Sequence, residues 1–336
     1  MLKKILVIAF ILILAIGAGI YFYASKVASF HDNIRIYIPR TSTTESLRDT
    51  LITRLGDDFG KKVFSIWSGL GGNINISRGS YVIHPGEKAY EVANRIAKGR
   101  QTPVKVVVNV ARTLNDLINS ISSKLESSPD EIQHAMDSVF VNDKDYGRRE
   151  RYTAAILPDT YEFYWNDSPL KVIETLSGYR DKYWNDERLK KADRLGFSPA
   201  QIVTLASIVE EESTKSDEQP IIAGLYINRL RKGMKLQADP TVKFALGDFS
   251  LRRITSKHLN VDSPYNTYKI IGLPPGPIRI PQKSTIDAVL NASVHNYLYM
   301  CAKEDFSGYH NFTSDYNTHL LNARRYAKAL DSRNIH

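Results

Sequence analysis

The chain has 336 residues, of which 43% are hydrophobic and 24% charged, so it can bury a core and is not disordered by composition. Its length fits about two domains. The formal net charge is +9, but lysines and arginines are scattered in short groups and no nucleic-acid motif accompanies them. Nucleic acid is therefore not an expected partner. Cys301 is the sole cysteine, which excludes an intrachain disulfide and a cysteine-based zinc site.

The N-terminus contains a long apolar run. Residues 5–25 carry no charged side chain, and a helix of that length spans the roughly 30 Å of bilayer hydrocarbon. Lys3 and Lys4 precede the run, so residues 1–4 are expected in the cytoplasm and the chain after Lys26 outside it. A cleaved signal peptide is the alternative, but the run exceeds a usual apolar signal region and no A-x-A site follows. The sequence predicts a single-pass anchor in the bacterial cytoplasmic (inner) membrane.

Residues 26–110 are predicted to form a small α+β module. The segment Ile34–Ile38 alternates as a strand does and is followed by a capped helix starting near Ser42–Thr44. A second strand from Gly79 leads through a Pro-Gly turn into a helix ending before Gly99. This order resembles the LysM-like module of some murein enzymes. A generic spacer without glycan affinity is the alternative.

A β-branched strand at residues 103–110 closes this module, because helical periodicity begins again near Thr113. The remaining residues, 111–336, are predicted to form a larger mixed α+β catalytic domain. The predicted fold class is therefore α+β: one transmembrane helix, the LysM-like module and this domain.

Three adjacent acids end a predicted helix that starts at Ser198 as N-cap and Pro199 as first helical residue. Its apolar residues Ile202, Leu205, Ala206 and Val209 form one stripe. At about 100° per residue, Glu210 and Glu212 border this stripe on opposite sides, whereas Glu211 points away. A carboxyl group at such a border can be partly desolvated and stay protonated as a general acid. The periodicity leaves Glu210 and Glu212 open, and a solvated acidic helix end is the alternative to both.

Polar, turn-rich segments follow a second predicted helix at residues 217–231. They hold Gln237 and Asp239 and, further on, the run Tyr265, Asn266, Thr267 and Tyr268. Aromatic rings and side-chain hydroxyl and amide groups suit sugar stacking and hydroxyl recognition. Purely structural loops share this composition, and Asp239, which precedes Pro240, could instead be an N-cap or turn residue.

Several motifs together resemble the YceG-like family of endolytic murein transglycosylases. They are Ala206–Ser213, Ile227–Leu230, Gly233–Val242, Ser263–Tyr268 and Gly272–Ile278, with Leu157–Tyr161 before them and His310–Thr313 and His319 after them. The N-terminal anchor and the LysM-like module fit the same family. The resemblance thus covers nearly the whole chain.

The resemblance assigns roles to individual residues. It implies that Glu210, the first acid after Ser-Ile-Val, is the catalytic residue. It further implies that glycan-binding residues lie in or under a cleft, namely Glu212, Gln237, Asp239, Tyr265, Asn266, Thr267 and Tyr268.

The implied activity is that of a lyase acting on nascent peptidoglycan. Glu210 would protonate the leaving oxygen of a MurNAc–GlcNAc β-1,4 bond, and its carboxylate would then deprotonate the attacking MurNAc 6-hydroxyl. The product would be a 1,6-anhydro-MurNAc end, and such cleavage would terminate strand elongation. No cofactor or metal is expected, because His310 and His319 lack a third partner at ligand spacing.

Two other functions stay open at this point. One is a muramidase-type hydrolase with Glu212 or Asp239 as the second carboxylate. The other is a catalytically silent glycan-binding scaffold. The expected partners are peptidoglycan strands and, by the position of the anchor, peptidoglycan synthases or divisome proteins.

Overall fold

The computed structural model of the chain describes residues 2–72, 74–109, 111–251 and 253–333. The predicted module boundary at Val110 and the outermost ends of the chain lie outside these residues. The chain divides into two compact units. The first comprises residues 1–106, 124–128 and 162–168, and the second comprises residues 107–123, 129–161 and 169–336.

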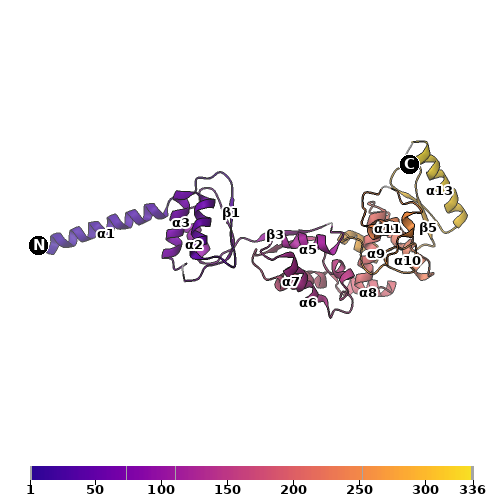
Figure 1. Cartoon of the computed structure of the whole chain (residues 1–336), viewed down its shortest axis with the longest axis horizontal. Coiled ribbons are helices and arrows are strands. Elements are labelled where there is room, and N and C mark those ends of the chain that lie inside the picture. The colour runs from indigo at the N-terminus through magenta and orange to yellow at the C-terminus, as the bar shows by residue number, and fades with distance from the viewer. Residues whose placement is uncertain (1, 73, 110, 252, 334–336) are drawn as a thin grey trace. The chain divides into compact units, whose positions relative to one another are not determined.

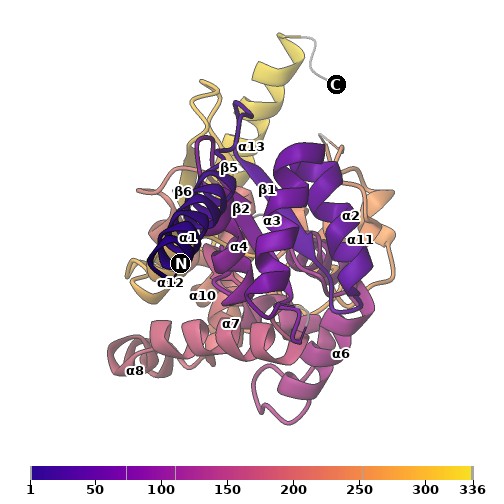
Figure 2. The same ribbon diagram turned by 90° about the vertical axis from the view of Figure 1, so that its left-hand side faces the viewer.

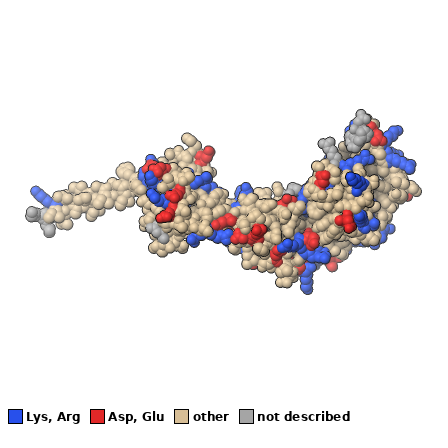
Figure 3. Space-filling model, viewed as in Figure 1, with Lys and Arg blue, Asp and Glu red and all other residues tan. Residues whose placement is uncertain are grey.

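The first unit begins with helix α1 (Leu2–Ala24), a run of apolar side chains that are exposed to solvent. Within the part of the chain that the structure describes, one helix is long and apolar enough to cross a membrane, at Lys3–Ala24. Figure 3 shows its surface free of charge beyond the basic side chains of its first turn. This finding is compatible with a membrane anchor.

The rest of the first unit is an α+β module. Its elements are β1 (Ile34–Ile38), α2 (Thr44–Leu55), α3 (Asp57–Gly69), β2 (Gly79–Ile83) and α4 (Ala89–Ala97). The two strands are antiparallel, with Ile34 opposite Ile83 and Ile38 opposite Gly79, and the helices pack side by side against them (Figures 1 and 2). Leu47, Leu51, Val63 and Trp67 are fully buried between these elements.

Strand β1, the starts of β2 and α2, and helix α4 were predicted from the sequence and are confirmed within one or two residues, whereas α3 was not predicted. Alternation in β1 and apolar residues at helical spacing in α4 reflect one buried face each. The likeness to a LysM-like module stays a prediction. The next strands, β3 (Val104–Val108) and β4 (Asp159–Phe163), pair with each other in a two-stranded sheet.

The second unit is mainly helical. Its first helices are α5 (Leu114–Ser122), α6 (Pro129–Phe140), the 3-10 helix η1 (Arg149–Ala155), α7 (Pro169–Tyr183) and α8 (Asp186–Leu195). They are followed by α9 (Pro199–Glu212), α10 (Gln219–Arg231), α11 (Asp239–Leu246), the 3-10 helix η2 (His258–Asn260) and α12 (Lys283–Leu290). The antiparallel pair β5 (Tyr299–Ala302) and β6 (His310–Thr313) and helix α13 (Tyr316–Asp331) complete the unit.

Helix α9 is the centre of this unit. Its start is as predicted: Ser198 is the N-cap in a capping box with Gln201, and Pro199 occupies the first turn. The prediction that this helix buries only one apolar side was wrong, however. Every residue from Ile202 to Val209 is buried, because α10, α11, α12 and η1 surround the helix on all sides. In a helix that is buried on every side, the angular spacing of the residues does not show which side faces the core. Periodicity therefore could not decide between the acids at the end of α9.

Candidate active site

The three acids at the end of α9 lie in different surroundings. Glu210 is 10% exposed and faces α12: its Oε2 accepts hydrogen bonds from the backbone N–H of Gln282 at 2.7 Å and from the Thr285 hydroxyl at 2.8 Å. Its Oε1 pairs with Arg279 at 3.1 Å. Both oxygens of Glu210 are thus engaged by donors that belong to the fold.

Glu211 does not point to solvent, although its angular position on the helix predicted that it points away from the apolar stripe. Its Oε1 lies 2.6 Å from Nη1 of Arg279 and 3.1 Å from Nη2 of Arg112, and only 16% of the side chain is exposed. Arg279 therefore bridges Glu210 and Glu211, and this ion-pair cluster ties α9 to the segments before α5 and α12.

Glu212 is partly buried on the opposite side, at a cavity of about 240 Å³. The cavity is lined by Glu212, Tyr226, Arg229, Gln237, Asp239, Tyr268, Met300, Cys301, Ala302 and His310. Among the described residues that line it, Glu212 is present and Glu210 is not. The cavity brings together α9, α10, the start of α11, β5 and β6.

The carboxyl group of Glu212 has a perturbed acidity. Burial raises the pKa of Glu212 to about 7, and the negative charge of Asp239 acts in the same direction. The Tyr226 hydroxyl donates a hydrogen bond of 2.7 Å to Oε1 and opposes this rise. A carboxyl group with such a pKa is protonated in a large fraction of molecules near neutral pH, as a general acid must be.

Asp239 lies on the same cavity as the first residue of α11, with Ala238 as N-cap. Its Oδ1 accepts a hydrogen bond of 2.6 Å from the Tyr268 hydroxyl. Burial and this carboxylate raise the pKa of Tyr268 above its usual range, so the hydroxyl stays a donor. Asp239 is therefore not the N-cap that the sequence left open, and its carboxylate is held by Tyr268.

Gln237 reaches the cavity through an uncommon backbone conformation. Its φ of 51° is left-handed, and its N–H donates to the carbonyl of Thr267 at 3.1 Å. A non-glycine residue in this region carries strain that the surrounding structure must compensate. Such strain is frequent at binding sites, and here it turns a polar side chain into the cavity wall.

The structure separates the other expected binding residues from the cavity. Asn266 and Thr267 are fully buried, so they cannot touch a bound glycan. Asn266 donates to the carbonyls of Leu259 and Val261, and Thr267 accepts from the N–H of Ala238. Both shape the loops beneath the site. Tyr265 packs its ring on Phe244, with centroids 4.6 Å apart, and does not line the cavity wall described above.

Some residues of the cavity were missed by reasoning from the sequence. Tyr226 and Arg229 belong to α10, and their inward direction depends on how α10 packs on α9. His310 matched a family signature but carried no assigned role. Its buried partner Glu218 had no signal in the sequence, because the pair is separated by ninety-two positions.

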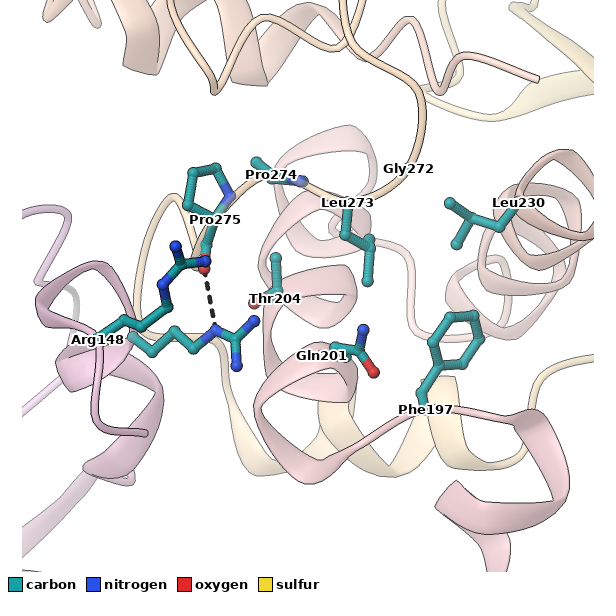
Figure 4. Close-up of a pocket in the computed structure, with 10 residues that line it drawn as sticks. Arg148, Phe197, Gln201, Thr204, Leu230, Gly272, Leu273, Pro274 and Pro275 are labelled. Carbon is teal, nitrogen blue, oxygen red and sulfur yellow. Dashed lines mark hydrogen bonds between the residues drawn. The ribbon is translucent and has the colours of Figure 1, made fainter. Parts of the chain in front are cut away.

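A second and larger cavity of about 360 Å³ opens beside the N-terminal half of α9 (Figure 4). Gln201 and Thr204 of α9, Phe197 and the Leu273-Pro-Pro275 segment line it together with Arg148 and Arg151. Arg151 donates to the carbonyl of Pro275 at 3.2 Å. No carboxylate belongs to the described lining of this cavity, so its size does not make it a site of acid catalysis.

Comparison with known proteins adds independent information. The chain is 37% identical over 155 residues to an endolytic murein transglycosylase of Bacillus subtilis, which covers 45% of this chain and 41% of that protein. It is 25% identical over 343 aligned positions to an endolytic murein transglycosylase of Streptococcus pneumoniae, covering 89% of this chain and 61% of that protein. The chain thus spans less than two thirds of the length of these curated relatives.

A solved structure also matches. The crystal structure of a YceG-like protein from Listeria monocytogenes aligns with a TM-score of 0.56 and 27% identity, covering 86% of this chain and 98% of that one. The model of the YceG-like family matches residues 36–325, which is well over half of the chain. The protein belongs to the YceG-like family.

Proposed function

We propose that this protein is a peptidoglycan lytic transglycosylase, a lyase, in which Glu212 is the catalytic acid. The observation that carries the proposal is the carboxyl group of Glu212, whose burial at the cavity raises its pKa to about 7. The names of the relatives from Bacillus subtilis and Streptococcus pneumoniae support the same activity. The substrate is the MurNAc–GlcNAc β-1,4 bond within nascent glycan strands.

This proposal moves the acid from Glu210, which the sequence motif implied, to Glu212. Both oxygens of Glu210 are engaged within the fold, by Arg279, the N–H of Gln282 and the Thr285 hydroxyl. Glu212 has one hydrogen bond, from Tyr226, and faces a cavity. The two glutamates therefore have different roles: Glu210 stabilises the fold, and Glu212 contacts the glycan.

The reaction needs a proton for the leaving oxygen. Protonated Glu212 donates its proton to O4 as the C1–O4 bond to the departing GlcNAc breaks. The 6-hydroxyl of the same MurNAc attacks its own anomeric carbon and gives up its proton to a base in the cavity. The product is a 1,6-anhydro-MurNAc end, and no water enters the bond. Tyr268, Gln237 and Asp239 supply donors and acceptors for sugar hydroxyl groups on the cavity wall.

A hydrolase is the second candidate, because Asp239 places another carboxylate on the same cavity as Glu212. Hydrolases of this type pair an acid with a base or nucleophile. Asp239 is less suited to that role, since its Oδ1 is held by Tyr268. In the transglycosylase, Asp239→Asn is expected to slow cleavage and leave the anhydro product unchanged; reducing-end MurNAc from the wild-type protein would establish the hydrolase.

The test uses the full-length chain in detergent, purified sacculi and mass spectrometry of the released fragments. Glu212→Gln is expected to reduce cleavage by about 10²–10⁴-fold, the usual effect of losing a general acid. Glu210→Gln is the matched control on the same helix turn, and it is expected to keep cleaving. Loss of activity in Glu210→Gln with activity retained in Glu212→Gln would return the acid to Glu210.

The location of the protein is part of the same proposal. α1 anchors the chain in the cytoplasmic membrane, with Lys3 and Lys4 inside and the rest of the chain outside. Cleavage beside the membrane would act on newly made strands and terminate their elongation. Peptidoglycan synthases and divisome proteins are the expected neighbours there.

A further inference from the structure

The buried residue Glu218 pairs with His310, which lines the cavity that holds Glu212. The carboxylate of Glu218 is 3% exposed and engages the same residue twice. Its Oε2 lies 2.9 Å from Nδ1 of His310, and its Oε1 accepts the backbone N–H of His310 at 2.7 Å. These two contacts fix the position and the rotation of the imidazole ring, as is typical of a histidine in a functional site.

The pair also fixes which ring nitrogen carries a proton. An ionised carboxylate can only accept hydrogen bonds, so Nδ1 of His310 must be the N–H donor. In the neutral ring, Nε2 then presents its lone pair. Nε2 makes no hydrogen bond within the described part of the chain, and the side chain lines the Glu212 cavity.

The charged groups that face this ring come from three other elements. Glu212 ends α9, Arg229 belongs to α10 and Asp239 begins α11. Arg229 has a structural role, because its Nε donates a hydrogen bond of 2.6 Å to the backbone carbonyl of Leu298. The cavity therefore contains a carboxyl group with a raised pKa and a separate imidazole ring that a carboxylate orients. Two titratable groups in different environments are the usual sign of distinct acid and base roles.

We propose that His310 is the catalytic base, which takes the proton of the attacking 6-hydroxyl, whereas Glu212 acts only as the acid. This inference rests on the proposed transglycosylase function. The bond from C1 to O4 of the leaving sugar breaks as the bond from O6 to C1 forms. O4 receives the Glu212 proton and Nε2 receives the O6 proton. Transfer of that proton from His310 to the Glu212 carboxylate through solvent restores the starting state, with no net gain or loss.

The division of labour is tested by changing the leaving group. One substrate is a natural peptide-free glycan strand, and the other is a glycan oligomer that ends in a 4-nitrophenyl MurNAc glycoside. Because 4-nitrophenolate departs without protonation, the activated substrate removes the need for an acid and leaves the need for a base. The readouts are nitrophenol release and the anhydro product.

Glu212→Gln is expected to lose about 10²–10⁴-fold on the natural strand and to come within about tenfold of the wild-type rate on the activated substrate. His310→Gln is expected to lose about 10²–10⁴-fold on both substrates. Near wild-type rates in His310→Gln would overturn the inference. So would its rescue by the activated substrate, which would place His310 on the leaving-group side.

A third result separates this inference from the proposed function. If Glu212→Gln stays inactive on the activated substrate while His310→Gln is active, Glu212 is both acid and base, and only the inference fails. If the wild-type protein forms no anhydro product from either substrate, the proposed function itself fails.

Glu218→Gln provides the second variant, which carries the test if His310→Gln does not fold. It removes the charge that orients the ring, and a loss of similar extent on both substrates is expected. Tyr309→Phe is the matched control: the neighbouring hydroxyl contacts only Asp217, at 3.3 Å, among the interactions described, and its removal is expected to change neither rate. Circular dichroism confirms folding of each variant before the rates are compared.

Discussion

The hydroxyl group of Tyr226, in the middle of α10, donates a hydrogen bond of 2.7 Å to Oε1 of Glu212 at the end of α9. This bond sets the orientation of the carboxyl group and stabilises its ionised form. Burial acts in the opposite direction and prevails, which raises the pKa of Glu212 to about 7. The balance between these two effects makes the pH dependence of the reaction predictable.

Cleavage by the wild-type protein is expected to decline as the pH rises through about 7. Glu212 must be protonated to act as the acid, so kcat/KM should fall about tenfold per pH unit above that value. The measurement is a pH profile of cleavage on a soluble glycan. A decline centred near 4.5, the ordinary value for a glutamate, would show that the acid of the reaction does not have the raised pKa described for Glu212.

Tyr226→Phe is expected to move the same decline to higher pH. The lost hydrogen bond had lowered the pKa of Glu212, so the carboxyl group of the variant stays protonated over a wider range. The pH profile of the variant, recorded beside that of the wild type, checks this. An unmoved or downward-shifted profile would contradict the hydrogen bond as described.

Glu212→Gln is expected to stabilise the protein at alkaline pH while it slows cleavage of the natural glycan. The folded pKa of about 7 exceeds the ordinary 4.5, so the folded state holds more protons than the unfolded state between these values. Stability of the wild type therefore falls as the pH rises from about 4.5 to 7. Glutamine does not ionise, and the variant should gain up to about 3 kcal/mol at pH 8 and little at pH 4. Urea unfolding at both pH values measures the difference.

Glu210→Gln is expected to weaken the fold and spare the chemistry. The substitution keeps acceptors for Gln282 and Thr285 but removes the charge facing Arg279, which remains paired with Glu211. A loss of about 1–2 kcal/mol is expected for one charge-assisted contact. The thermal midpoint and the cleavage rate are measured together. Unchanged stability with lost cleavage would be the opposite of this result.

Gly276→Ala is expected to be among the most damaging changes to the loop before α12. A Cβ at this position would lie 1.7 Å from the backbone carbonyl oxygen of Glu150, so one of the two backbones must move. The cost should be at least about 2 kcal/mol. Gly272→Ala is the matched comparison in the same loop. A Cβ at this position meets no atom within 4 Å, and only the backbone φ of 95° disfavours alanine, which should lower the free energy of unfolding by about 1 kcal/mol. Equal thermal midpoints in the two variants would argue against the contact with Glu150.

Much of the local structure could be read from the sequence. The strand at Ile34–Ile38, the N-cap at Ser198 and the first-turn Pro199 follow from side-chain chemistry within a few neighbouring residues. The long apolar helix at the N-terminus follows from composition alone. Such features depend on contacts close in the chain, and these contacts are the same wherever the segment lies in the fold.

The direction of each acid on α9 could not be read in that way. Wheel geometry assumes one buried side, but α9 is enclosed on all sides, so Glu211 is paired with Arg279 rather than exposed. Asn266 and Thr267 were expected in or under the glycan cleft from the family resemblance, which could not tell these two positions apart. Both are buried, and their hydrogen-bonding groups fix the loops beneath the cavity.

By itself, the sequence determined the long apolar helix at the N-terminus, several of the helices and strands that follow it, and the presence of an acidic end on one helix. The tertiary structure decided which acid meets the cavity. Arg279, which lies sixty-nine positions after Glu210, forms an ion pair with the Glu210 carboxylate. The packing of α10 against α9, in contrast, partly buries Glu212 beside Tyr226. The acidity of a carboxyl group depends on the charges and the burial around it, and these are supplied by residues far away in the chain.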